Sequence, residues 1–317
     1  MGDKSKIEWT DASWNPIVGC SKVSEGCRNC YAIRSANRMN GSNELYNGLT
    51  KQVNGNIEWT NIVRFSEERL LQPLKWKRPR KIFVNSMSDL FHESVSDAQI
   101  ENIFAVMCVA QKHIFQVLTK RPERMKSFLI QPHIKDSVRF KVEEGLGYNI
   151  DFDKMWPIVN VWLGVSVEDQ KTADERIPLL LQTPAAIRWI SAEPLLGHMN
   201  VEPYLGIESE DGYDLPHLNW IVAGGESGPN ARPSHPTWFR SLRDQALEYN
   251  VPFFFKQWGE WIAAGQTISN PMWMPKNILS SKFPDGQNTM RLTRKLDSHT
   301  LDGKEWNEFP DLENLLA

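Results

Sequence analysis

Short apolar runs that end abruptly in polar residues recur along this chain, and they constrain its fold more than any other feature. Such runs are expected to be strands, and they lie at 81–85, 114–118, 159–165, 187–190, 220–223 and 251–255. Helical patterns or helix-start signals separate most of them, as at 171–181 and from Pro122 and Pro236. Strands that alternate with helical crossovers predict a parallel sheet covered on both faces.

A further strand before Cys20 brings the expected count to about seven. Because a complete eight-stranded barrel usually takes about 250 residues, we expect an α/β fold with an incomplete (β/α) TIM-like barrel of about six to seven parallel strands. A doubly wound sheet is the alternative. Residues 1–259 are expected to form the barrel, with a loop-rich insertion at about 129–157, and residues 260–317 a C-terminal appendage. The stretch 60–71 is expected to be helical.

Three of the four cysteines lie within eleven residues, in the stretch NPIVGCSKVSEGCRNCY from Asn15 to Tyr31, which we name the cysteine segment. Cys20, Cys27 and Cys30 are spaced CxxxxxxCxxC, and the residues between them are typical of turns. A helix is expected at 31–39, directly after the segment. Cys108 lies in an apolar helical run and is expected to be a buried small hydrophobe.

Composition narrows the class of protein. Hydrophobic residues make up 41% of the 317 residues, which suffices for a sizeable core, and there is neither an apolar run of membrane-spanning length nor a signal-like N-terminus. We therefore expect a cytoplasmic protein. Clustered thiols in a reducing compartment bind metal or do redox chemistry more often than they form disulfides. The net charge of -3 excludes a uniformly basic surface, so any nucleic-acid contact must be local.

Polar residues at the carboxyl ends of the strands are the candidate site residues, because the active site of a βα barrel collects there. Ser86, Ser88 and Asp89 follow one strand, and the segment 224–226 (Gly224, Gly225, Glu226) follows another; both are candidates for cofactor binding. Lys120, Glu168 and Glu193 are candidates for catalysis. Some of these candidates have a structural alternative. Asp89 could be a cap or turn residue, and the two glycines could form a tight turn. Glu168 and Glu193 could form an ion pair with Lys120 or Arg188.

Three thiolates on one loop suit two metal centres. A structural zinc site needs a fourth ligand, and the nearest histidine in sequence, His92, lies on another expected loop. A 4Fe-4S cluster held by three cysteines keeps one iron open to a ligand such as S-adenosylmethionine (SAM). Zinc and free thiols remain the alternatives to the cluster.

The segments TDASWNPIVGCSKVSEGCRNCYA, KIFVNSMSDLFH, LTKRPERM, LGVSVEDQ, ISAEPLL and IVAGGESGPNARP resemble the phage-encoded three-Cys-motif family, described as radical-SAM-like. The resemblance runs from about Trp9 to Trp258. The usual radical SAM loop is CxxxCxxC with an aromatic residue before the last cysteine. Here six residues separate the first two cysteines, Asn29 precedes Cys30, and Tyr31 follows it.

The resemblance implies an enzyme with a 4Fe-4S cluster on Cys20, Cys27 and Cys30 that reductively cleaves SAM to modify a substrate, which we expect to be a nucleotide or nucleic acid. It implies an electron donor such as a flavodoxin or ferredoxin, and a neighbouring partner protein is a further candidate. The rival from another class is a non-catalytic, metal-stabilised module that binds nucleic acid or protein. A cluster protein with non-radical transfer chemistry is a third reading.

Overall fold

The computed structural model describes residues 5, 7–152, 155–206, 215–263, 266, 279–291 and 299–311. The chain divides into two compact units. Unit 1 comprises Met1–Ser24, Cys30–Val165 and Leu179–Arg188, and unit 2 comprises Glu25–Asn29, Ser166–Pro178 and Trp189–Ala317. The expected boundary at residue 259 and the expected insertion at 129–157 stay predictions.

Seven strands form the main sheet in the order β1-β6-β7-β8-β9-β10-β11, and every pair whose register is defined is parallel. The strands are β1 (Ala12–Trp14), β6 (Lys81–Val84), β7 (Ile114–Thr119), β8 (Val161–Ser166), β9 (Ile187–Ala192), β10 (Trp220–Gly224) and β11 (Phe253–Gln257). This confirms the expected α/β fold with an incomplete TIM-like barrel. All six residues of β8 and all five of β10 are buried, as expected of strands covered on both faces.

The helices expected at 31–39 and 171–181 and from Pro122 and Pro236 are present, together with others. They are α1 (Tyr31–Met39), α2 (Glu67–Leu70), α3 (Gln72–Lys75), α4 (Asp97–Val109), α5 (Pro122–Leu129), α6 (Ile134–Phe140), α7 (Gln170–Leu181) and α8 (Pro236–Glu248). The short helices are η1 (Glu25–Cys27), η2 (Glu44–Tyr46), the π-helix η3 (Lys141–Gly145) and η4 (Glu202–Tyr204). Ser96 begins α4 with a reciprocal capping box to Gln99, which fixes the start of that helix.

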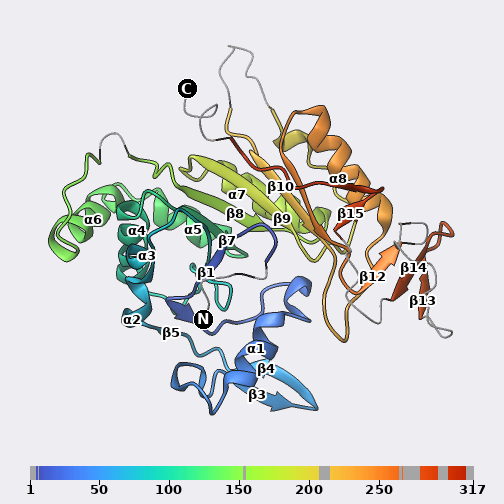
Figure 1. Cartoon of the computed structure of the whole chain (residues 1–317), viewed down its shortest axis with the longest axis horizontal. Helices are drawn as coiled ribbons and strands as arrows, with labels where there is room; N and C mark the ends of the chain where they lie inside the picture. Colours follow the sequence, from blue (N-terminus) through green and yellow to red (C-terminus); the bar gives the residue numbers. More distant parts are fainter. Residues whose placement is uncertain are drawn as a thin grey trace. The chain divides into compact units, whose positions relative to one another are not determined.

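The remaining strands form small antiparallel sheets. They are β2 (Ile17–Val18) with β5 (Arg64–Phe65), β3 (Thr50–Val53) with β4 (Asn56–Trp59), the sheet β12 (Trp261–Ala263), β14 (Asn288–Arg291) and β13 (Ser280–Lys282), and β15 (Thr300–Leu301) with β16 (Lys304–Glu305). In unit 1, α1 packs against β3 and β4, and α4 packs against α3 and α6 (Figure 1). In unit 2, α8 packs against β10 and β11.

One local expectation is wrong. Instead of one helix at 60–71, the chain forms β5 and then α2, because Arg64 and Phe65 pair with Val18 and Ile17 and so leave the helical pattern. The segment 129–157 contains α6 and η3, whose Ile134, Val138 and Val142 are buried. None of the described helices has the length and apolar character needed to cross a membrane.

Cys108 yields a prediction. It is fully buried in α4, and burial raises the pKa of its thiol to about 12. Because the thiolate is the reactive form, iodoacetamide should modify Cys20, Cys27 and Cys30 in the folded, metal-free, reduced protein and leave Cys108 intact. Mass spectrometry would show three modified cysteines before unfolding in urea and four after it. Labelling of Cys108 in the folded protein as fast as the other three would contradict its placement.

Candidate functional site around the cysteine segment

The cysteine segment leaves the end of β1 and leads into α1. Cys20 and Cys30 are half-buried thiols that form no disulfide. Both pack against one hydrophobic cluster of unit 1, made of Val18, Ala32, Ile33, Ala36, Tyr46, Leu49, Trp59 and Met87. Cys27, at the end of η1 in unit 2, is likewise half-buried and forms no disulfide. The fold thus holds two of the thiols on the same apolar support.

Ser86 ties the two ends of the cysteine segment to the end of β6. Its hydroxyl donates to Asn15 Oδ1 at 3.1 Å, and its carbonyl accepts from the Tyr31 hydroxyl at 3.0 Å. The contacts of Ser88 within the described residues are local: its hydroxyl donates to the Asp89 carbonyl at 3.4 Å, and its N–H donates to the Asn85 carbonyl at 3.2 Å. The role of both serines in cofactor binding stays a prediction.

Arg121, just after β7, contacts the first part of the cysteine segment. Its Nη2 donates to Ser21 Oγ at 2.7 Å and to the Ser21 carbonyl at 3.4 Å, and its Nη1 lies 4.0 Å from Cys20 Sγ. A guanidinium beside a sulfur favours the thiolate, which is the form that binds metal. Arg121 therefore both fastens the loop and sets the charge next to Cys20.

Asp89 holds Arg121 in place. One carboxylate oxygen accepts from Phe91 N at 3.0 Å and Thr119 Oγ1 at 2.7 Å, and the other accepts from Lys120 N at 3.0 Å and Arg121 Nη1 at 3.2 Å. Four protein donors thus surround the carboxylate, which leaves it little capacity to accept from a cofactor ammonium group. Its observed contacts join the ends of β6 and β7 and orient the guanidinium.

The charge of Arg121 is well compensated. Burial by itself lowers the pKa of Arg121, but Asp89, Glu93 and Cys20 more than offset burial, so the pKa lies above its ordinary value. Glu93 Oε1 accepts from Arg121 Nε at 2.8 Å, and this bond holds the pKa of Glu93 below its ordinary value although burial opposes the shift. The guanidinium stays charged at any physiological pH.

His92, the nearest histidine in sequence to the three cysteines, also contacts the cysteine segment, although it lies on a different loop. Its Nε2 lies 2.9 Å from Ser21 Oγ, while its Nδ1 accepts from Ser94 N at 3.1 Å. Burial, followed by the charge of Arg121, lowers the pKa of His92. The neutral ring with its proton on Nε2 therefore donates to Ser21.

In unit 2, Glu226 and Arg232 contact the middle of the cysteine segment. Arg232 Nη2 donates to Glu226 Oε1 at 2.6 Å and to the Glu25 carbonyl at 2.9 Å. Glu226 Oε2 accepts from Asn29 Nδ2 at 3.1 Å. Burial raises the pKa of Glu226, but the hydrogen bonds from Arg232 and Asn29 outweigh it and bring the pKa below its ordinary value. Glu226 is thus an ionised anchor of residues 25–29.

Glu168 is almost fully buried and lies against Gly26 of the cysteine segment. A Cβ at position 26 would stand 2.3 Å from Glu168 Oε1, so any other residue there would require the Glu168 side chain to move. The carboxylate forms an ion pair with Arg176 at 3.2 Å, whereas sequence reasoning named Lys120 or Arg188 as the alternative partner. Its role in catalysis stays a prediction, and its observed contacts are structural.

Glu193, at the end of β9, pairs with Lys256 at 2.5 Å. The backbone N–H of Lys120 donates to Asp89, which places this residue at the end of β7 beside Arg121. The sequence-predicted residues of unit 1 (Ser86, Asp89, Lys120) thus gather at adjoining strand ends. Those of unit 2 gather as Glu226 and Glu168 around residues 25–29, with Glu193 paired to Lys256.

The glycines after β10 differ from each other. A Cβ on Gly225 would stand 1.9 Å from the backbone oxygen of Trp258, so the close approach that requires glycine is to the protein's own chain. A Cβ on Gly224 would find ordinary contacts with Glu193 and Lys256 at 3.4 Å or more. The expected approach of a cofactor to this turn stays a prediction.

In the part of the chain that the structure describes, no three His, Cys, Asp or Glu side chains stand close enough together to hold a metal ion. The three cysteines therefore fit a cluster by donor type, spacing and freedom from disulfides, and not by a preassembled geometry. The sequence did not identify Asn29 or Arg176 as site residues, and it singled out His92 only as the nearest histidine. Asn29 had a usable signal, since it lies between two expected metal ligands, whereas Arg176 gave none.

Residues 4–310 match the model of a family described as "Protein of unknown function (DUF5131)". No curated protein and no solved structure matches the chain.

Replacing Arg121 tests how the first part of the cysteine segment is held. Arg121→Ala would leave Asp89 buried without its cation, so we expect a loss of about 3 kcal/mol in the free energy of unfolding. Hydrogen–deuterium exchange at residues 20–22 should also become faster. Denaturant titration and exchange mass spectrometry measure both effects.

The matched control is Lys171→Ala, because Lys171 forms an exposed pair with Glu175 at 3.9 Å. It should change the free energy of unfolding by less than about 1 kcal/mol. Equal stability of the two variants would contradict the anchoring role of Arg121.

Gly225→Ala should destabilise the protein by about 3 kcal/mol or more, because backbone of the Trp258 segment must move to admit the methyl group. Gly224→Ala, one residue earlier, should change the free energy of unfolding by less than about 1 kcal/mol. Thermal or denaturant unfolding of the two variants compares them directly. A mild effect at Gly225 would show that the two segments approach less closely.

Proposed function

The chain belongs to the DUF5131 family, and from its cysteine segment we propose that it is a radical-SAM-like iron–sulfur enzyme. It reductively cleaves SAM to modify a substrate, with a nucleotide or nucleic acid as the favoured class. Cys20, Cys27 and Cys30 hold the 4Fe-4S cluster, and a flavodoxin or ferredoxin supplies the electron. A partner protein that completes the site is part of the same hypothesis.

The placement of Cys20 and Cys30, half-buried, outside any disulfide and packed on one hydrophobic cluster, carries this proposal. Buried structural thiols are inert, and thiols that bind metal are partly exposed and lie near positive charge. Cys20 meets both conditions, since Arg121 Nη1 lies 4.0 Å from its sulfur. Cys108, fully buried in α4, meets neither.

A 4Fe-4S cluster bound by three cysteines supplies an electron and an iron with an open position, where SAM is held for reduction. The protein's own residues have supporting roles. Arg121 favours the thiolate of Cys20 and, with Asp89, fixes the loop at Ser21. Glu226 fixes Asn29, two residues after Cys27 and next to Cys30.

Candidates for contact with SAM and substrate remain at the strand ends. Ser86, Ser88, Gly224 and Gly225 are proposed to line the cofactor site, with Asp89 and Glu226 acting through the residues that they hold. Lys120 and Glu193 are proposed to handle protons at the substrate. Glu168, which forms an ion pair with Arg176, is proposed to act there as well.

A second candidate function has one observation in its favour. His92 contacts Ser21, next to Cys20, and its ring is neutral, which is the form that ligates zinc. A Cys₃His zinc site would give a non-catalytic, metal-stabilised module that binds nucleic acid or protein. The two candidates differ in the metal and in the need for His92.

Anaerobic purification followed by metal analysis tests the proposal. We expect a brown protein with about four irons and four sulfides per chain, and 5′-deoxyadenosine after addition of dithionite and SAM. Cys20→Ala, Cys27→Ala and Cys30→Ala should each lose most of the iron, whereas Cys108→Ala should keep it. His92→Ala should also keep it.

Stoichiometric zinc that falls with His92→Ala, together with no 5′-deoxyadenosine, would replace the enzyme with the zinc module. A full iron content with SAM turnover but no 5′-deoxyadenosine would indicate transfer chemistry without a radical step. Iron that persists in all three cysteine variants would remove the cluster from this segment.

A further inference from the structure

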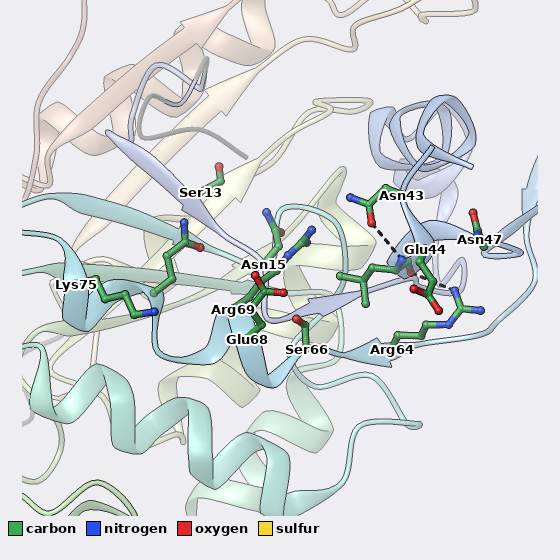
Figure 2. A pocket seen from close by; sticks show the side chains of 12 residues that line it. Ser13, Asn15, Asn43, Glu44, Asn47, Arg64, Ser66, Glu68, Arg69 and Lys75 are labelled. Atoms are coloured by element: carbon green, nitrogen blue, oxygen red, sulfur yellow. Dashed lines mark hydrogen bonds between the residues drawn. The ribbon is translucent and has the colours of Figure 1, made fainter. Parts of the chain in front are cut away.

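A large polar cavity lies in unit 1, and it reaches the cysteine segment at Asn15. Its volume is about 1010 Å³, which is enough for a nucleotide-sized ligand. One side is formed by the turn that contains η2, and another by the chain from β5 through α3. Ser13 in β1 and Asn15 just after it complete the lining (Figure 2). The lining residues are Ser13, Asn15, Asn43, Glu44, Leu45, Asn47, Arg64, Ser66, Glu68, Arg69, Gln72 and Lys75.

The lining of this cavity is unusual for a small-molecule site. Eleven of its twelve residues are polar or charged, and Leu45 is the only apolar one. Most ligand pockets are predominantly apolar with a few polar groups. A cavity with this lining would take a hydrophilic ligand that hydrogen-bonds on most of its surface, and it would not favour a lipid or an apolar peptide.

Three cations, Arg64, Arg69 and Lys75, line the cavity. Arg64 donates to the Leu45 carbonyl at 3.1 Å, and Arg69 donates to the Tyr46 hydroxyl at 3.4 Å with its guanidinium 5.7 Å from the centre of that ring. Within the described residues neither arginine nor Lys75 forms an ion pair. Neutral groups thus orient both guanidinium groups, so each can still form a charge-assisted hydrogen bond to an anion.

The cavity also presents acceptors and hydroxyls. Glu44 and Glu68 line it and form no ion pair in the described part of the chain. Ser66 precedes α2 at the N-cap position, yet its hydroxyl does not cap that helix. Two carboxylates would repel a long polyanion, but each accepts well from a hydroxyl or amino group.

The walls are tied to the main sheet of unit 1. Trp14 Nε1 donates to the Arg69 carbonyl at 2.8 Å, and Ser66 N donates to the Pro16 carbonyl at 2.7 Å. These bonds hold the Arg64–Arg69 wall against β1 and the start of the cysteine segment. A site held in this way is largely formed before its ligand arrives, which limits the entropy lost on binding.

We propose that this cavity binds a small phosphorylated molecule that also carries hydroxyl groups. The phosphate contacts Arg64, Arg69 and Lys75, and the hydroxyl or amino groups of the ligand donate to Glu44 and Glu68. The shared chemistry is that of a nucleoside phosphate or a polyol phosphate. This site is independent of the proposed enzyme function and needs neither the cluster nor SAM.

Isothermal titration calorimetry of the full chain, without SAM, tests the site with four probes: AMP, glycerol phosphate, inorganic phosphate and adenosine. At least one of the two phosphate esters should bind about tenfold or more tightly than inorganic phosphate, because hydrogen bonds to charged carboxylates add to the phosphate contacts. Adenosine should bind more weakly than AMP. A preference for AMP identifies a nucleoside phosphate, and a preference for glycerol phosphate a polyol phosphate.

Variants locate the binding. Arg64→Ala and Arg69→Ala should each weaken binding of the preferred ester about tenfold or more, since each removes a charge-assisted hydrogen bond. Lys75→Ala should weaken it, whereas Lys77→Ala, an exposed cation two residues along that does not line the cavity, should not. Glu68→Gln should weaken the ester but not inorganic phosphate. These last three changes are at exposed positions, where folding is least affected.

The proposal is overturned if none of the probes binds at millimolar concentration, or if inorganic phosphate binds as tightly as both esters. Equal losses in Lys75→Ala and Lys77→Ala would also overturn it, since they would indicate nonspecific attraction to the basic residues of 75–81 (KWKRPRK). Calorimetry measures binding alone, so loss of this site would leave the cluster and SAM cleavage unaffected, and absence of the cluster would leave this site intact.

Discussion

The parallel direction of neighbouring strands is the constraint on which the cysteine segment depends. β6 and β7 run the same way, so the residues that follow them meet at one edge, and there Asp89 accepts from Thr119, Lys120 and Arg121. This carboxylate accepts hydrogen bonds from backbone and side-chain donors of the next strand end, and these bonds need no cofactor. The guanidinium that it orients is then available to hold Ser21 beside Cys20.

Most of the fold follows from the pattern of apolar residues and from the residues that begin and end helices and strands. The six strands of 81–255 and the helices opened by Ser96, Pro122 and Pro236 were predictable, because each joins an apolar run to a strong boundary signal. The helix expected at 60–71 was not formed, since a long-range pairing with β2 overrides local propensity. The β3–β4 hairpin was missed although its turn, Asn54-Gly55, is a strong signal.

The candidate site was predictable in its positions but not in its partners. The ends of the predicted strands pointed to Asp89, Glu168 and Glu226. Glu168 and Glu226 contact the cysteine segment directly, and Asp89 contacts it through Arg121. Their arginine partners come from 8 residues along the chain for Glu168, 6 for Glu226 and 32 for Asp89. Such pairing depends on how helices and loops return to the sheet, which spacing along one chain does not specify.

The wide gap between Cys20 and Cys27 has a structural use. Of its six residues, Ser21 binds Arg121, Lys22 pairs with Glu58 on β4 at 2.6 Å, and Glu25 binds Arg232. A shorter CxxxCxxC loop has only three residues in this gap and fewer side chains with which to attach itself. Loop-closure entropy rises only slowly with length, so the added residues cost little. The extra residues thus attach the loop to three different parts of the protein. Substitutions of Ser21, Lys22 or Glu25 would loosen the loop although every cysteine stays in place.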